Sequence, residues 1–454
     1  MEYFNIISNQ RNFFNSNASK ELSFRKAQLI KLRTLLKSNE KRLYEAIDAD
    51  FKKGEFETYA TELGLLYTDI AEALKKMRHW SRTKRVRTNL PNLPARSYII
   101  PEPYGVCLVI GAWNYPYQLS IAPVVAVLAA GNTVILKPSE LSANTSALMA
   151  ELINSNFAPE VFHVVEGGVT ETTALLEQKF DKIFFTGSVP VGNIVYQAAA
   201  KNLTPVTLEL GGKSPAFVFA DTHLKVTAKR IVWGKFLNAG QTCIAPDYVL
   251  VENKIKDGFL KAVKSQIEQF RYSFDNKNYV QIINERNFQR LTALIDKEKV
   301  FCGGESDEQT RFISPTVLSN VDFNHLSMQD EIFGPILPVI GFDNLETVVA
   351  EVKNRSKPLA CYVFTRSKLV RRKILHAISF GGGAANDTIM HISNSRLPFG
   401  GVGHSGTGSY HGEAGFRTFS HYKSVLQKPF RFEPNLKYPP YTEGKKKWIK
   451  RFLK

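Results

Sequence analysis

The chain has few cysteines for its length. Its 454 residues include four of them, Cys107, Cys243, Cys302 and Cys361. They are far apart, and they form neither a Cys-x-x-Cys pair nor the cysteine and histidine spacing of a zinc site. This pattern argues against a disulfide-stapled module and against a metal site, so we expect no metal and a reduced, cytoplasmic protein.

Long apolar runs are also missing. The nearest candidate, residues 119–130, contains Ser120 and Pro123, whereas a membrane-spanning helix needs about 20 apolar residues. The first residues, MEYFNIISNQ, lack the basic and apolar regions of a secretory signal. We therefore expect no membrane span and no cleaved leader, and residues 119–130 are better explained as a buried helix.

Acidic residues are outnumbered, because 42 Asp and Glu face 59 Lys and Arg, which gives a net charge of +17. Residues 435–454 hold seven basic side chains against one acidic one, a net +6 that leaves +11 elsewhere. Such a surface attracts nucleic acids, anionic membranes or acidic metabolites, or is simply solvated. No basic and aromatic motif of a nucleic-acid-binding module is present, so we expect no nucleic-acid partner.

The basic tail also carries apolar residues at helical spacing. Trp448 and Phe452 are four residues apart, as are Ile449 and Leu453, and lysines surround them. A short helix here would be basic and amphipathic, which suits an anionic membrane surface. We expect either peripheral membrane contact through this tail or a disordered tail without a partner.

The remaining composition is that of a globular protein, with 44% hydrophobic and 22% charged residues. Single cores stop growing near roughly 250–300 residues, so we expect two large domains. Residues 21–80 show the apolar spacing of amphipathic helices, interrupted at Gly54. Residues 82–96 are basic and contain two prolines, which indicates a connector or an edge hairpin.

Short apolar runs alternate with helical patterns between residues 106 and 210. Strands are expected at 106–113, 132–137, 161–165, 182–187 and 205–210, with helices at 118–130, 143–156, 170–178 and 190–200. This alternation predicts a doubly wound α/β domain with a parallel sheet, whose ligands bind at the carboxyl ends of the strands. A second mixed α/β segment follows from residue 211 to about 415, with strands at 249–252 and 360–364 and a helix at 254–270.

Three residues could carry covalent chemistry. Cys243, in AGQTCIAPD, can be a nucleophile if its pKa is lowered or if donors stabilise the thiolate, although a small buried residue is the simpler interpretation. Glu209, in LELGGKSP, ends an apolar strand, where a raised pKa would make it a general base and an ion pair is the alternative. Asn114, in GAWNYP, could donate to an oxyanion or could simply form a turn.

A phosphate site is indicated more weakly. FTGS, which contains Gly187 and Ser188 and continues to Gly192, is a strand-to-helix turn of the kind that exposes backbone N–H groups, but it lacks the G-x-G-x-x-G pattern. Lys137 and Glu140 follow a strand, where either can bind ribose hydroxyls.

Together these segments resemble the aldehyde dehydrogenase superfamily, and most closely its class 3 branch, which includes fatty-aldehyde members. The resemblance covers residues 20 to 430, and the order and spacing of its motifs make it specific. The motifs are PYGVCLVIGAWNYP (103–116), GNTVILKPSE (131–140), FTGS (185–188), LELGGKSP (208–215), GQTC (240–243), EIFGP (331–335) and LPFGGVGHSGTG (397–408). One departure is His404, where Asn or Lys is common.

The resemblance implies a role for each matching residue. Cys243 would be the nucleophile, Glu209 the base and Asn114 the oxyanion-hole amide of an enzyme that oxidises aldehydes to carboxylic acids through a thioester. The cofactor-binding positions would be Lys137, Glu140, Gly187, Ser188, Gly192, Glu331, Phe333 and Phe399. Glu140 favours NAD, because a 2′-phosphate would meet a like charge, but Lys137 and the habits of class 3 leave NADP open.

The resemblance also implies an architecture. It consists of a Rossmann-type parallel-sheet cofactor domain (1–81 and 106–208), an α/β catalytic domain (209–415), a small oligomerisation arm (82–105 and 416–434) and the basic tail (435–454). We expect a homodimer that acts on medium-chain, long-chain or aromatic aldehydes. The alternatives are a CoA-acylating relative, a narrow-substrate semialdehyde dehydrogenase and a non-catalytic NAD-binding protein. The presence of Glu209 argues against the first and the full set of Cys243, Glu209 and Asn114 against the last.

Overall fold

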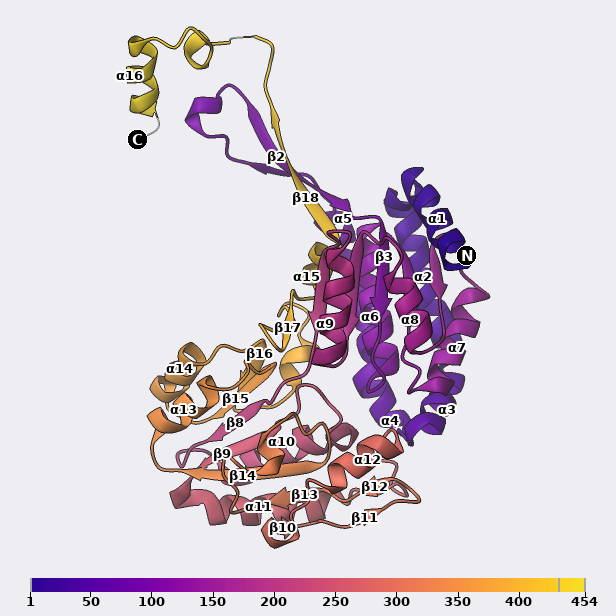
Figure 1. Cartoon of the computed structure of the whole chain (residues 1–454), viewed down its shortest axis with the longest axis vertical. Coiled ribbons are helices and arrows are strands. Elements are labelled where there is room, and N and C mark those ends of the chain that lie inside the picture. Colours follow the sequence, from indigo (N-terminus) through magenta and orange to yellow (C-terminus); the bar gives the residue numbers. More distant parts are fainter. Residues whose placement is uncertain (1, 432, 453–454) are drawn as a thin grey trace.

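Three main β-sheets organise the chain (Figure 1). They are seen in a computed structural model that describes residues 2–431 and 433–452. One sheet has six strands, one has seven and one has three. The two larger sheets lie in separate halves of the body, and the small sheet rises from it as an arm. The α/β architecture expected from the sequence is confirmed.

The six-stranded sheet has the order β17-β7-β6-β3-β4-β5. Five of its strands are parallel, as the alternating pattern predicts, and apolar side chains bury β3, β4 and β6 on both faces. The strands are β3 (Val106–Ile110), β4 (Thr133–Lys137), β5 (Phe162–Val164), β6 (Lys182–Thr186), β7 (Val206–Glu209) and β17 (Gly406–Thr407). Four helices connect the parallel strands: α6 (Pro116–Ala130), α7 (Ala143–Asn154), α8 (Val169–Leu176) and α9 (Val189–Ala200).

N-terminal helices pack beside this sheet. The expected amphipathic segment forms α2 (Leu22–Ser38), α3 (Glu40–Phe51), α4 (Glu55–Thr58), a π-helical turn (Tyr59–Leu63) and α5 (Gly64–Trp80). Helix α1 (Glu2–Asn15) precedes them and was not expected from the sequence. It is tied to the sheet by Gln10, whose Nε2 donates to the carbonyl oxygens of Val134 and Pro159, each at 2.9 Å.

The seven-stranded sheet has the order β10-β13-β14-β9-β8-β15-β16 and is parallel except at β10. Its strands are β8 (Pro215–Val218), β9 (Tyr248–Glu252), β10 (Val300–Cys302), β13 (Thr316–Leu318), β14 (Ile336–Phe342), β15 (Ala360–Phe364) and β16 (Gly382–Ala385). Its helices are α10 (Leu224–Phe236), α11 (Lys256–Phe270), α12 (Glu285–Thr292), α13 (Leu345–Lys353) and α14 (Lys368–Ala377). The strand pair β11 (Ser306–Asp307) and β12 (Phe312–Ile313) stands apart from it.

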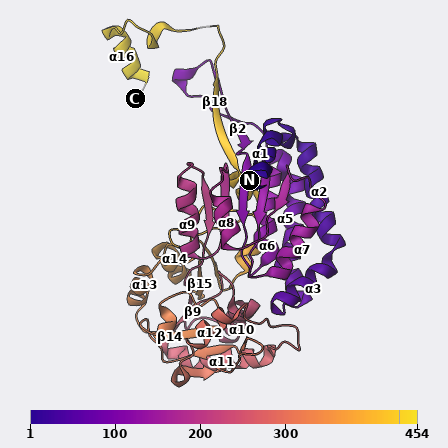
Figure 2. The ribbon, with the colours of Figure 1, turned by 45° about the vertical axis from the view of Figure 1, so that its right-hand side comes forward.

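The arm is an antiparallel sheet of β1 (Lys84–Val86), β2 (Arg96–Pro103) and β18 (Ser420–Gln427). Of the two alternatives expected at 82–96, a connector and an edge hairpin, the structure shows the hairpin. Helix α15 (Gly412–Thr418) precedes β18. Helix α16 (Glu443–Phe452) lies beyond the arm, far from the body (Figures 1 and 2). No helix in the described ranges is both long enough and apolar enough to cross a membrane.

One strand crosses between the two halves of the sequence. β17 lies within the segment expected to be catalytic, yet it pairs antiparallel with β7 in the six-stranded sheet, with Gly406 opposite Glu209. Gly406 has a φ of 144°, and a Cβ there would lie 2.3 Å from the Leu208 carbonyl oxygen. Only glycine allows so close an approach, so the glycine-rich segment fixes the end of β7.

Candidate active site

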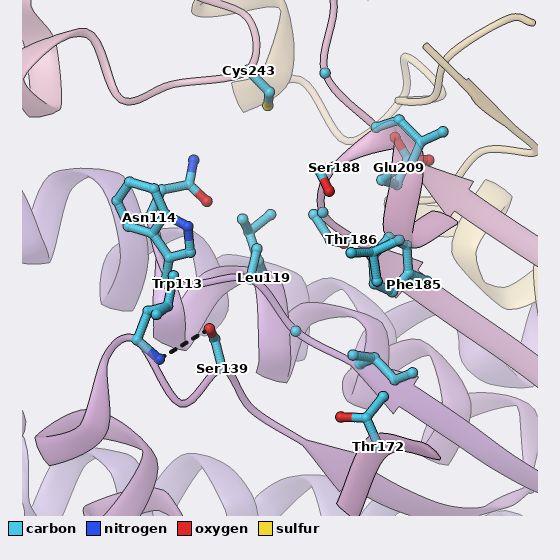
Figure 3. Close-up of a pocket in the computed structure, with 18 of the residues that line it drawn as sticks. Trp113, Asn114, Leu119, Ser139, Thr172, Phe185, Thr186, Ser188, Glu209 and Cys243 are labelled. Atoms are coloured by element: carbon cyan, nitrogen blue, oxygen red, sulfur yellow. Dashed lines mark hydrogen bonds between the residues drawn. The ribbon is translucent and has the colours of Figure 1, made fainter. Parts of the chain in front are cut away.

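A cavity of about 530 Å³ opens at the carboxyl ends of the six-stranded sheet (Figure 3). Residues following β3, β4, β6 and β7 form one wall, and loops of the seven-stranded half form the other. Ten of the eleven site residues expected from the sequence line it, namely Asn114, Lys137, Glu140, Gly187, Ser188, Glu209, Cys243, Glu331, Phe333 and Phe399.

Gly192 is the exception, because it is not among the lining residues of this cavity. It lies inside α9 and is buried, and a Cβ at this position would meet the Leu210 side chain at 2.7 Å. Its small size is therefore explained by the packing of α9 against the end of β7. The expected contact of Gly192 with a cofactor stays a prediction, and the packing of α9 is a second reason for a glycine at this position.

The loop that carries Cys243 has an unusual backbone. Asn238 and Ala239 adopt left-handed conformations, with φ values of 53° and 50°, and Gly240 follows with 72°. A Cβ on Gly240 would lie 2.2 Å from the Gly334 carbonyl oxygen, so a side chain has no room there. Left-handed non-glycine residues cost energy and persist only where the surroundings hold them.

Hydrogen bonds join this loop to Asn114. The Asn114 Nδ2 donates to the Gln241 carbonyl oxygen at 3.0 Å. An amide nitrogen has two hydrogens, so one remains for an oxygen in the cavity. Behind the loop, the hydroxyls of Tyr115 and Thr242 are 2.6 Å apart. Asn114 and Cys243 both face the cavity in Figure 3, which brings an amide donor and a thiol to one place.

Burial, followed by the charges of the nearby Glu331 and Glu209 carboxyl groups, raises the pKa of the Cys243 thiol to about 12. The backbone N–H groups of Cys243 and Ile244 act in the opposite direction but do not outweigh burial. The thiol therefore rests protonated. This finding differs from the lowered pKa that sequence reasoning gave as one route to a reactive cysteine.

Glu209 ends β7 and is 3% exposed. Neither of its carboxyl oxygens has a hydrogen-bond partner within the described residues. Burial alone raises its pKa well above the usual value, so the expected rise is confirmed. The alternative that Glu209 forms a structural ion pair is wrong, because no basic side chain among the described residues contacts its carboxyl group. An unpaired carboxyl facing a cavity is suited to accept a proton from water.

Lys137 and Glu140 form an ion pair at the end of β4, with 2.8 Å between Nζ and Oε2. Lys137 is buried, whereas Glu140 is half exposed. Burial acts to raise the pKa of Glu140, but the hydrogen bond and charge of Lys137, together with a backbone hydrogen bond, lower the pKa below its usual value. A carboxylate next to the cavity can accept hydrogen bonds from sugar hydroxyls.

Glu331 and Phe333 approach from the other half. A Cβ on Gly211 would lie 1.9 Å from Glu331 Oε2, which explains the glycine that follows LEL in LELGG. Phe333 has a φ of 49° and packs edge-on against Trp113, with ring centroids 5.5 Å apart. Burial, followed by the charge of Asp247, raises the pKa of Glu331 to about 8.

Sequence reasoning missed a buried group of charges behind Glu331. Lys213 Nζ contacts Asp247 Oδ2 at 2.5 Å, and Asp247 Oδ1 accepts from the Ile332 N–H at 3.0 Å. Lys235 is fully buried nearby, and burial lowers its pKa to about 8. The only signal in the sequence is that Lys213 and Asp247 lie inside the LELGGKSP and AGQTCIAPD motifs.

The cavity fits a dinucleotide. Apolar side chains of α8 and α9 line its outer end and are exposed, with Val169 at 79% and Ile194 at 59%, so they can cover a flat base. Gly187 and Ser188 stand at the N-terminus of α9, where backbone N–H groups and the helix dipole favour phosphate. The carboxylate of Glu140 also lines the cavity, close to Gly168 at the start of α8, where it can accept hydrogen bonds from a ribose.

Comparison with known proteins points in the same direction. The profile of the aldehyde dehydrogenase family matches residues 3–425. The 4,4′-diaponeurosporen-aldehyde dehydrogenase of Staphylococcus aureus is 46% identical over 446 residues, which cover 97% of each chain. The aldehyde dehydrogenase family 3 member A2 of Rattus norvegicus is 44% identical over 98% of this chain and 93% of its own. The dimeric NADP-preferring aldehyde dehydrogenase of Canis lupus familiaris is 43% identical over 96% and 97%.

Solved structures agree with this result. A substrate-bound Staphylococcus aureus AldH superposes with a TM-score of 0.97 at 44% identity, covering 100% of this chain and 99% of its own. A Mycobacterium tuberculosis aldehyde dehydrogenase complexed with NAD+ gives 0.83 at 26% identity, covering 94% and 90%.

Proposed function

Because the chain belongs to the aldehyde dehydrogenase family and is an NAD(P)-dependent enzyme, we propose that it oxidises aldehydes through a thioester on Cys243. The observation that carries this proposal is the convergence of a thiol, an amide donor and an unpaired carboxyl on one cavity. Cys243 is the nucleophile, Asn114 holds the oxyanion and Glu209 is the general base.

The first step forms a bond between the Cys243 sulfur and the aldehyde carbon. Because the thiol rests protonated, its proton must pass to solvent water before attack. The electron pair of the carbonyl moves onto oxygen, where the free N–H of the Asn114 amide and the Cys243 backbone N–H stabilise it. In a protease, which belongs to a different class of enzyme, loss of one such donor costs about 3–4 kcal/mol of transition-state stabilisation.

When bound, the nicotinamide dinucleotide supplies the acceptor for the hydride of the former aldehyde carbon. The residues that would hold it are those of the cavity wall: Lys137 and Glu140 at the ribose, the N-terminus of α9 at the phosphates, and Glu331 and Phe333 at the nicotinamide end. Their part is to orient the cofactor and to exclude water from the reacting carbon.

The thioester is then hydrolysed. Glu209 removes a proton from a water molecule, whose oxygen attacks the thioester carbon while the bond to Cys243 breaks. Glu209 passes this proton to the departing sulfur, which regenerates the thiol, and the carboxylic acid leaves. A base with a raised pKa is suited to this step, because it takes up a proton readily near neutral pH.

Of the two cofactors that the family uses, we favour NAD. The Glu140 carboxylate would repel a 2′-phosphate, and its partner Lys137 is already paired with it. Better catalytic efficiency with NADP than with NAD would contradict this assignment.

Medium-chain, long-chain or aromatic aldehydes are the proposed substrates. The name of the relative in Staphylococcus aureus specifies diaponeurosporen-aldehyde, and that protein aligns with this chain over nearly its whole length. A narrow-substrate semialdehyde dehydrogenase is the alternative, and a panel of aldehydes of increasing chain length separates the two.

The protein is proposed to be a homodimer that forms through the arm. The relative in Canis lupus familiaris is described as dimeric, and the arm exposes large apolar side chains, among them Leu90, Leu426 and Phe430. Helix α16 is proposed to touch anionic membranes, because it is basic, projects from the body and exposes Trp448. The four unpaired cysteines fit a reducing compartment such as the cytoplasm.

The test is a rapid-mixing assay that follows the absorbance of the reduced cofactor with a long-chain aldehyde. The wild type should turn over steadily, whereas Cys243→Ala should be inactive. Glu209→Gln should still give a burst of reduced cofactor, followed by a steady rate about a hundredfold or more below wild type, since general bases contribute roughly 10²–10⁴.

The matched control for the thiol is Cys302→Ala, because Cys302 is partly buried and lies outside the cavity. It should keep the wild-type rate. Full activity in Cys243→Ala, or a Glu209→Gln variant without a burst, would contradict the assigned roles.

A further inference from the structure

Asn238 connects the two loops that form the oxyanion site. Its side-chain Nδ2 donates to the carbonyl oxygen of Asn114 at 2.9 Å and to that of Gln241 at 3.1 Å. Its backbone N–H points the other way and donates to a carboxyl oxygen of Glu57 at 3.0 Å. One residue thus joins the loop of the amide donor, the loop of the thiol and the N-terminal helices.

Glu57 reaches this point from a distant part of the sequence. It lies on α4, 181 positions before Asn238, and is buried. It shares its surroundings with two fully buried charges, Lys53 and Glu62, whose Nζ and Oε1 atoms are 2.7 Å apart. Burial raises the pKa of Glu57, while Lys53 and the Asn238 N–H act to lower it. Burial of a carboxyl group costs free energy unless the group is hydrogen-bonded, so Glu57 depends on the bond from the Asn238 N–H.

The hydrogen bond from Asn238 to Glu57 stabilises a left-handed stretch of backbone. Asn238 and Ala239 are both left-handed, a conformation that L-residues rarely adopt in succession. Glu57 accepts from the N–H of the first of them, and Gln241 fastens the end of the turn, with its backbone N–H donating to the Asn238 carbonyl oxygen at 3.0 Å. Without the hydrogen bond to Glu57, the Asn238 backbone could rotate. The hydrogen bond from Asn238 Nδ2 to the Asn114 carbonyl oxygen would then weaken.

We infer that Glu57 is a positioning residue which, acting through Asn238, sets the place of the Asn114 amide relative to the Cys243 sulfur. This inference rests on the proposed function, because it concerns the oxyanion formed in that reaction. Glu57 does not line the cavity and is not a catalytic residue. A misplacement of about 1 Å in an active site can cost roughly a hundredfold in rate.

The test compares two reactions of the same thiol. Addition to an aldehyde needs the oxyanion donors and is read from the burst of reduced cofactor. Alkylation by iodoacetamide displaces iodide from a saturated carbon and forms no oxyanion, and it is read from modification of the Cys243 peptide by mass spectrometry. Glu57→Ala should slow the burst about tenfold to a hundredfold while the alkylation rate stays within about twofold of wild type.

Conservative variants check the cause. Glu57→Gln keeps an oxygen that can accept from the Asn238 N–H and should restore most of the burst rate. Asn238→Asp removes the Nδ2 donor without removing the backbone N–H, and it should give the same selective loss as Glu57→Ala. It also keeps the inference testable if Glu57→Ala does not fold.

The matched control is Asp50→Ala. Asp50 is another buried carboxylate of the N-terminal helices, but it accepts from the N–H groups of Asn144 and Thr145 at the start of α7. It should lower the melting temperature and leave the ratio of the two rates unchanged.

The outcomes separate this inference from the proposed function. Equal losses in burst and alkylation, or a wild-type burst in Glu57→Ala, would overturn the positioning role while the wild-type burst still supports the thioester route. A wild type without any burst, or an active Cys243→Ala, would overturn the proposed function first.

Discussion

Glu331 is a carboxyl that the fold keeps away from water. It lies against Gly211 and close to Asp247, and burial is the main reason that its pKa rises to about 8. Lys213 and Lys235 lie nearby and act in the opposite direction without outweighing burial. The folded protein therefore binds a proton at Glu331 over a pH range in which the unfolded chain has released it.

A stability prediction follows from this difference. With a folded pKa of about 8 against an unfolded value of 4.5, the stability contributed by the neutral Glu331 is complete below the unfolded value and is lost as the pH rises toward 8. Glu331→Gln cannot ionise. We compare the free energy of unfolding of Glu331→Gln with that of wild type at about pH 5 and at about pH 9. The difference should shift in favour of the variant at the higher pH by up to a few kcal/mol, since one pKa unit is about 1.4 kcal/mol.

Urea unfolding at the two pH values measures this gain. Glu298→Gln, at an exposed position, is the control and should change stability equally at both. A constant difference between Glu331→Gln and wild type would show that Glu331 is ionised in the folded protein throughout.

Residues of the site differ in how well the sequence predicts them. Asn114, Glu209 and the Lys137 and Glu140 pair stand at the ends of strands or within a few residues of them. The carboxyl ends of parallel strands meet at one edge, so their convergence could be foreseen. Glu57 could not be foreseen, because its partner lies 181 positions away and one buried acid leaves no periodic pattern. The resting protonation of Cys243 also depends on burial, which a motif does not state.

At the scale of elements, a buried ion pair ties the N-terminal helices to α6. Glu62 lies in the π-helical turn, and its Oε2 accepts from the N–H of Tyr117 at 2.8 Å, in the first turn of α6. Its Oε1 contacts Lys53 Nζ at 2.7 Å, and both side chains are fully buried. The N-terminus of α6 follows the Asn114 loop, so this pair fixes how that loop leaves the sheet.

We expect Glu62→Ala to destabilise the protein by about 3–5 kcal/mol, because it leaves the Lys53 ammonium buried without its partner. The double variant Lys53→Met with Glu62→Leu should lose less than the single variant, since no buried ammonium is then left without its partner. Denaturant midpoints of the three proteins measure the difference. A double variant that is less stable than Glu62→Ala would contradict this account.

Elements that bury both faces or repeat a helical spacing were predictable. The five parallel strands and the helices between them match their expected ranges to within a few residues. β17 was not predictable, because a strand of two residues in a glycine-rich segment has no alternation to detect. Helix α1 was missed because the contacts that hold it are tertiary, namely the packing of Ile7 on the sheet and the hydrogen bonds of Gln10.

At the scale of the whole molecule, the arm and the tail leave the body together and bear different surfaces. The arm exposes Leu426 on β18 and Leu90 beside β1, which suits a second copy of the chain. The tail helix α16 exposes lysines and Trp448, which suits an anionic bilayer. The two proposed contacts are therefore separable by variants.

Light scattering and vesicle co-sedimentation of the same samples test this separation. Deletion of residues 443–454 should abolish binding to vesicles that contain phosphatidylserine and leave a dimeric mass. Leu426→Glu should give a monomeric mass and melt near the wild-type temperature, because the exposed side chain has no packing to lose within one chain. Vesicle binding that survives the deletion, or a dimer in Leu426→Glu, would contradict the respective assignment.

The position of β17 has a consequence for synthesis on the ribosome. The parallel strands of the first sheet are all made before residue 210, yet its edge beside Glu209 is completed by residues 406–407. Asn132 likewise donates through Nδ2 to the Phe419 carbonyl oxygen at 2.9 Å, across 287 positions. During synthesis, the edge of β7 therefore stays unpaired until residues 406–407 have emerged from the ribosome. An unpaired sheet edge is a site at which unfinished chains can pair with one another.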